Sequence, residues 1–159
     1  MTDRSFTVSF TVAETPEAVF AAVNNVRGWW SEEIEGNTDK VGGLFRYHFR
    51  DLHRCTMKVM ELVPAKKVAW HVLDNYFSFT KDKIGWTGSD IVFEIAGNGN
   101  RTDLRFTHHG LVPEDECYAA CSDGWSTYIK TSLRDLIVTG KGRPNLGKPL
   151  TETERALVR

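Results

Sequence analysis

The sequence predicts an α+β fold in which a curved antiparallel sheet of about six or seven strands grips one long C-terminal helix, with two short helices after the first strand. Two patterns carry this prediction. Apolar and polar residues alternate in segments between Ser5 and His108, as in half-buried strands, and after Pro113 apolar residues recur at steps of three or four, as in a helix. We expect one domain over residues 1–142 and a tail over residues 143–159 with at most a short helix.

The first strand and the first helix follow from local patterns. Apolar residues alternate with hydroxyl residues over 5–13, which predicts a strand with one buried face. Thr15 then suits a helix N-cap and Pro16 suits the first helical position, so a short helix begins there. Residues 24–37 mix apolar side chains, a glycine and acids, and we expect a second short helix or a turn.

Alternation also predicts the remaining strands, at residues 44–50, 55–63, 67–73, 91–95 and 104–108. The run Gly-Asn-Gly-Asn over 97–100 accommodates positive φ, which predicts a hairpin between the last two strands. From residue 114 acids fill the first turn of a helix of about seven turns, and Gly140 supplies its left-handed C-terminal cap.

Charge and hydropathy exclude several classes of protein. Lys and Arg number 20 and Asp and Glu number 21, so the net charge is −1 and we expect no nucleic-acid partner. The longest apolar run, residues 18–23, is too short for a membrane span, and no basic and apolar leader opens the chain. We therefore expect a cytoplasmic protein whose three cysteines form no disulfide framework.

Several segments resemble the family of activator of heat-shock-protein-ninety ATPase homologues, within the START-like or SRPBCC superfamily of helix-grip folds. The matching segments are residues 15–20, 28–31, 42–47, 61–70 and 104–111, with further matches in the long helix. The resemblance implies a deep cavity between the curved sheet and the final helix, which in the superfamily holds an apolar or aromatic small molecule. It supplies no catalytic motif, because the superfamily includes lipid carriers, hormone receptors and aromatase/cyclases.

Aromatic residues are the candidates for the wall of such a cavity. Phe, Tyr and Trp make up 11% of the chain, more ring volume than one helix needs as filler. Each ring is equally compatible with a place in the core. The residues that we predict to bind a ligand are Trp30, Tyr47, Trp70, Phe93, Phe106, His108, Trp125 and Tyr128.

Polar candidates are fewer. His108 shares a strand face with Phe106, and its imidazole either binds a ligand carbonyl, acts as an acid or base, or forms hydrogen bonds within the core. Tyr47 is a possible partner for it. Cys117 and Cys121 are four residues apart, but they lack the further ligands of a structural zinc site, so we expect no metal. The chain has no nucleotide-binding or hydrolase motif, so we expect no cofactor and assign no catalytic residue.

Three functions remain open. The leading one is binding of an apolar or aromatic small molecule, and a cyclase or dehydratase acting on a carbonyl compound in the same cavity is the second. The third is a chaperone-associated module that docks a protein partner on the outer sheet face, where Arg46, His48, Arg50 and Arg54 form a basic stripe. The sequence favours a binding protein over an enzyme and leaves the ligand and the oligomeric state open.

Overall fold

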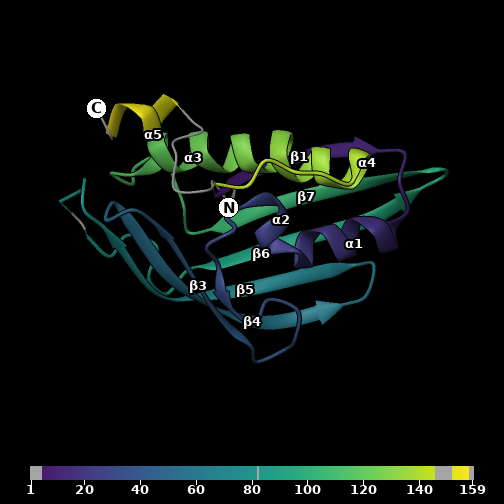
Figure 1. Ribbon diagram of the computed structural model, residues 1–159, viewed down its shortest axis with the longest axis horizontal. Helices are drawn as coiled ribbons and strands as arrows, with labels where there is room; N and C mark the ends of the chain where they lie inside the picture. The colour runs from purple at the N-terminus through teal and green to yellow at the C-terminus, as the bar shows by residue number, and fades with distance from the viewer. Residues whose placement is uncertain (1–4, 82, 146–151, 158–159) are drawn as a thin grey trace.

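The computed structural model describes residues 5–81, 83–145 and 152–157. A seven-stranded antiparallel sheet curves beneath one long C-terminal helical segment, and the first helices pack on the same side of the sheet (Figure 1). The strand order is β1-β7-β6-β5-β4-β3-β2, so the first strand pairs with the last. The predicted α+β fold is confirmed, including the strand count and the two short helices after the first strand.

The strands are β1 Phe6–Val12, β2 Glu35–Gly36, β3 Leu44–Phe49, β4 His53–Val63, β5 Lys67–Phe77, β6 Asp90–Asn98 and β7 Arg101–His109. The helices are α1 Pro16–Asn24, α2 Val26–Trp29, α3 Tyr118–Thr127, the π-helical turn η1 Tyr128–Leu133, α4 Arg134–Thr139 and α5 Glu152–Leu157. In the part of the chain that the structure describes, no helix is long and apolar enough to cross a membrane.

The caps and turns predicted from the sequence are present. The Thr15 hydroxyl accepts a hydrogen bond from the amide of Ala18 at 3.1 Å, and Pro16 is the first residue of α1. Gly140 ends α4 with φ of +84°, the left-handed conformation that glycine adopts without strain. The register of β4 against β5 shifts beside Met57 and again beside Glu61, and such irregularities bend a sheet.

The long helix differs from the prediction in two ways. It begins at Tyr118 rather than at residue 114, because Asp115 forms a turn instead: its carboxylate accepts from the Val112 amide at 3.0 Å and its carbonyl accepts from the Tyr118 amide at 3.0 Å. Its middle turn, η1, is π-helical rather than α-helical. Single π turns are rare and occur frequently at functional sites.

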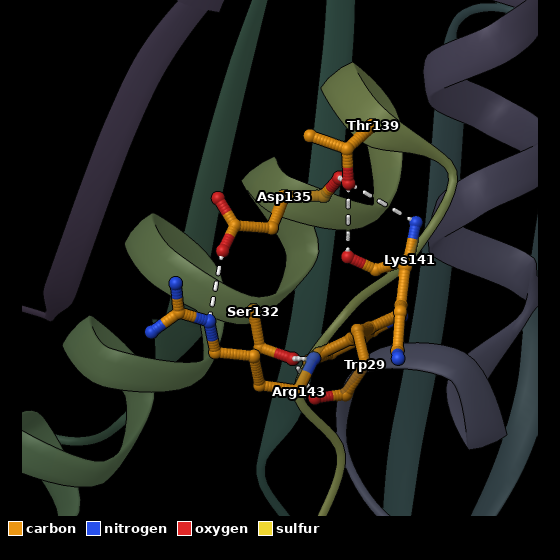
Figure 2. Close-up of polar contacts among 6 residues, drawn as sticks. All are labelled: Trp29, Ser132, Asp135, Thr139, Lys141 and Arg143. Atoms are coloured by element: carbon orange, nitrogen blue, oxygen red, sulfur yellow. Dashed lines mark hydrogen bonds and ion pairs between the residues drawn. The ribbon is translucent and has the colours of Figure 1, made fainter.

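The chain after α4 turns back along the helix and ties it to the loop that follows α2 (Figure 2). The buried Ser132 hydroxyl donates to the Trp29 carbonyl at 2.6 Å and accepts from the Arg143 amide at 2.7 Å. The Asn145 amide donates to the Trp30 carbonyl at 2.8 Å. The described part of the tail thus contacts the domain, while the boundary at residue 142 stays a prediction.

Gly142 is required where this returning segment crosses α2. A β-carbon at this position would lie 2.2 Å from the carbonyl oxygen of Gly28 and 3.0 Å from that of Ser132. Both neighbours are backbone atoms, which cannot rotate away. The close approach of the two segments therefore depends on the absence of a side chain.

Candidate functional site

A cavity opens between β3, β4 and β5 on one side and α3 and α5 on the other. Its volume is about 70 Å³, within a larger space of about 560 Å³ that includes open solvent. Cavities of about 150 Å³ hold benzene, so a ring-sized ligand requires side chains at the mouth to move. The cavity is lined by Trp30, Tyr47, Phe49, Leu52, His53, Phe77, Phe79, Trp86, Ala120, Cys121, Gly124, Trp125, Tyr128 and Glu154.

Four of the eight predicted ligand-binding residues line this cavity: Trp30, Tyr47, Trp125 and Tyr128. Trp30 lies at their centre, stacked on Tyr47 with ring centroids 4.2 Å apart and tilted against Trp125 at 5.0 Å. Trp125 in turn stacks on Trp86 at 5.4 Å. These contacts form a continuous aromatic wall whose rings hold one another in place.

The other four predicted residues, Trp70, Phe93, Phe106 and His108, lie in the core behind this wall and do not line the cavity. Phe93 packs edge-on against Trp70 at 5.0 Å and against Phe106 at 5.2 Å. Phe106 then contacts Trp125 at 4.7 Å. This second layer supports the cavity wall through close packing.

Both nitrogens of His108 are occupied. The Trp125 indole N–H donates to Nδ1 at 3.1 Å, so the remaining proton lies on Nε2, which is 2.8 Å from the Ser89 hydroxyl. Burial, with a smaller contribution from His109, lowers the pKa of His108 to about 3, so the ring is neutral at pH 7. His108 thus orients Trp125, and the structure does not bring it together with Tyr47, which lies against Trp30 and His53.

His53, which sequence reasoning missed, is the imidazole that lines the cavity. Its Nε2 lies 2.8 Å from Oδ1 of the buried Asn75, and burial lowers its pKa to about 4 although that hydrogen bond acts in the opposite direction. The amide nitrogen of Asn75 has no hydrogen-bond partner among the described residues. His53 is in phase with Cys55 and Met57, so extending the alternation of β4 by one step towards the N-terminus would have found it.

The mouth of the cavity carries a carboxylate. The Tyr128 hydroxyl donates to Glu154 Oε2 at 3.1 Å and accepts from the Asn145 side chain at 3.1 Å. Burial raises the pKa of Tyr128 above its ordinary range, and the negative charge of Glu154 has a smaller effect in the same direction. Two parts of the tail, residue 145 and α5, therefore meet at the rim of the cavity.

Trp86 links the wall to the two cysteines at the start of α3. Its indole N–H donates to the sulfur of Cys121 at 3.2 Å, and Cys117 lies beside Cys121. Among the described residues no group of three or more His, Cys, Asp and Glu side chains is placed to hold a metal ion. The arrangement offers flat apolar surface with a few polar groups, which suits binding of a small molecule.

On the outer sheet face, acids accompany the predicted basic stripe. Glu35 lies opposite Arg46 in the β2–β3 register, and Glu33 contacts His48 at 3.3 Å. The guanidinium of Arg54 lies over the ring of Tyr76, 4.5 Å from its centroid. The stripe is therefore partly balanced by acids on neighbouring segments.

Comparison with known proteins places the chain in a family. The family model described as Activator of Hsp90 ATPase homolog 1-like protein matches residues 13–137. A solution structure of an Aha1 dimer from Colwellia psychrerythraea is 26% identical, with a TM-score of 0.69, over 87% of this chain and 98% of that chain. No curated protein sequence matches the chain.

Two further solved structures share the fold at lower identity. An HSP90 activator from Plasmodium falciparum is 20% identical, with a TM-score of 0.58, over 87% of this chain and 97% of that chain. CalU16 from Micromonospora echinospora is 13% identical, with a TM-score of 0.61, over 87% of this chain and 76% of that chain. The family match covers most of the domain, and the chain belongs to the Activator of Hsp90 ATPase homolog 1-like protein family.

Proposed function

We propose that this protein binds a small, flat, apolar or aromatic molecule in the cavity between the sheet and α3. The observation that carries the proposal is the continuous wall of Trp30, Tyr47, Trp125 and Trp86, which faces a space with an open mouth. Aromatic pairs contribute about 0.5–1.5 kcal/mol beyond the area that they bury, so a planar ligand gains most against such a wall.

Polar groups at two places orient the ligand. His53, which is bonded to Asn75, lies at one side of the cavity, and the pair of Tyr128 and Glu154 lies at its mouth. A neutral imidazole and a carboxylate both accept hydrogen bonds, which favours a ligand with a hydroxyl or amine substituent on its ring. Because His53 has a pKa of about 4, it offers this acceptor throughout the neutral range.

Gly124 provides a substitution that tests the proposal directly. It lines the cavity from α3, and a β-carbon built there meets no atom within 4 Å. Gly124→Leu therefore adds apolar volume at the cavity wall, on a β-carbon that itself meets no neighbour. Ala119→Leu is the matched control, since it adds similar apolar volume to an exposed position of the same helix.

The experiment is calorimetric titration with 2-naphthol, preceded by native mass spectrometry of freshly purified protein to identify any molecule already bound. We expect binding to the natural chain and to Ala119→Leu, and an affinity at least tenfold lower for Gly124→Leu. Absence of both a retained molecule and naphthol binding, or equal binding by all three proteins, would refute the proposed cavity function.

Chaperone docking is a second candidate. It is supported by the description of the family model and by the 26% identity to the Colwellia Aha1 structure. Measurement of Hsp90 ATPase activity with and without the protein tests it, with Arg46→Glu as the variant that alters the outer face. Stimulation by the natural chain that the variant lacks would favour this candidate, whereas an unchanged ATPase rate would exclude it for the chaperone used.

A further inference from the structure

We propose that Cys117 and Cys121 form a reversible dithiol and disulfide pair at the wall of the cavity. The two residues are four apart at the start of α3, and the Cys121 amide donates to the Cys117 carbonyl at 2.8 Å. Their side chains share one face of the helix, and each sulfur shifts the pKa of the other. Cys121 lines the cavity beside Trp86, but the proposal does not depend on the proposed binding function.

Each thiol is reached from a different side. Cys117 lines a shallow hollow of about 30 Å³ together with Gly85, Asp115 and Glu116. Cys121 lines the main cavity. Both residues are only 6% exposed, so the oxidant that we propose is a small one, a peroxide, and not a bulky reagent.

The environments of the two sulfurs give them unequal roles. The hydrogen bond from Cys121 lowers the pKa of Cys117, which stands at the N-cap of α3, whereas burial raises the pKa of Cys121. Thiolates are the reactive form, so Cys117 reacts first with the oxidant and Cys121 resolves the product.

The reaction balances with hydrogen peroxide as the oxidant. The Cys117 sulfur attacks one peroxide oxygen, the O–O bond breaks, and sulfenic acid and one water form. The Cys121 sulfur then attacks the Cys117 sulfur, a sulfur–sulfur bond forms, and the hydroxyl leaves with the Cys121 proton as a second water. Two thiols lose two electrons and two protons, and one peroxide becomes two waters.

Helix geometry makes this bond easy to reduce. Residues four apart in a helix have β-carbons about 5–6 Å apart, whereas a disulfide requires about 3.5–4.5 Å. The first helical turn must therefore open to form the bond, and a strained disulfide of this kind is labile rather than structural. As the sulfur of Cys121 moves towards Cys117, it leaves the indole N–H of Trp86, now 3.2 Å away.

The test is to treat the protein with equimolar hydrogen peroxide and to measure its intact mass, its peptide map and its tryptophan fluorescence. Glutathione is then added and the measurements are repeated. We expect loss of two hydrogen masses, one peptide linking positions 117 and 121, an altered fluorescence spectrum, and recovery with glutathione. Cys117→Ser and Cys121→Ser should each prevent the loss. Cys55→Ser is the control and should still lose two hydrogen masses, because Cys55 lies in β4. Among the described residues, Cys55 forms no hydrogen bond with either of the two thiols.

The proposal would be overturned by no change in mass, by oxygen addition without crosslinking, or by a crosslink between two chains. Loss of two hydrogens that persists in Cys117→Ser would do the same. Each readout is independent of ligand binding, so failure here and failure of the naphthol titration are distinguishable.

Discussion

Substitution of Gly124 by alanine should stabilise the protein. Gly124 is inside α3, and a β-carbon there meets nothing within 4 Å, so the change adds no clash. Glycine is about 1 kcal/mol less favourable than alanine in a helix interior, because its backbone loses more freedom on folding. The free energy of unfolding should therefore rise by about 1 kcal/mol, and Tm by about 2–4 °C for a chain of this size.

Urea denaturation followed by tryptophan fluorescence measures this change. The midpoint should rise while the slope of the free energy against urea stays the same, since the variant exposes the same surface on unfolding. A lower midpoint for Gly124→Ala would refute the reasoning, because it would mean that the space beside α3 is occupied or that the helix requires glycine at this point.

Three further predictions concern the core and the returning segment. Gly142→Ala should lower Tm by several degrees in a thermal melt, because its β-carbon would lie 2.2 Å from a backbone oxygen; an unchanged Tm would contradict the close approach. Ser132→Ala should lower the free energy of unfolding by about 1–3 kcal/mol, since the buried Trp29 carbonyl and the part-buried Arg143 amide lose their partner. The exposed Thr139→Ala should change it little in the same urea titration. Because the folded-state pKa of His108 is about 3 and its ordinary value is 6.5, the unfolded chain binds the extra proton between these pH values. Stability should fall as pH falls through that window, and the share of His108 is at most about 1.4 kcal/mol per pH unit, in addition to that of His53, whose pKa is about 4. His108→Gln should reduce this slope in urea titrations at stepped pH, with the share of His53 remaining, and an unchanged slope would assign the effect to other groups.

Local patterns predicted the sheet well because each strand carries its own alternation. Phe45 and Tyr47, for example, fall on the buried face as their phase requires. Alternation cannot tell how far along a strand the covering helix extends. Trp70 and Tyr47 both point inward, yet Trp70 is in the core and Tyr47 lines the cavity, and only the tertiary position of α3 separates them.

Two of the missed residues, Trp86 and Glu154, lie where local patterns are weak. Trp86 belongs to the connection between β5 and β6, which has no regular period, and it reaches the cavity through contacts with Trp125 and Cys121 that are distant in sequence. Glu154 reaches Tyr128 from the tail, 26 residues away. Spacing within one segment carries no information about such pairs.

The pairing of the first strand with the last has a consequence for folding. Thr7 and Thr107 face each other across β1 and β7 although they are 100 residues apart. Closing so long a loop is entropically unfavourable before other contacts form, so β1 should join after the hairpin of β6 and β7. During synthesis β1 therefore leaves the ribosome first and stays unpaired, with its apolar face exposed, until nearly the whole sheet has been synthesised.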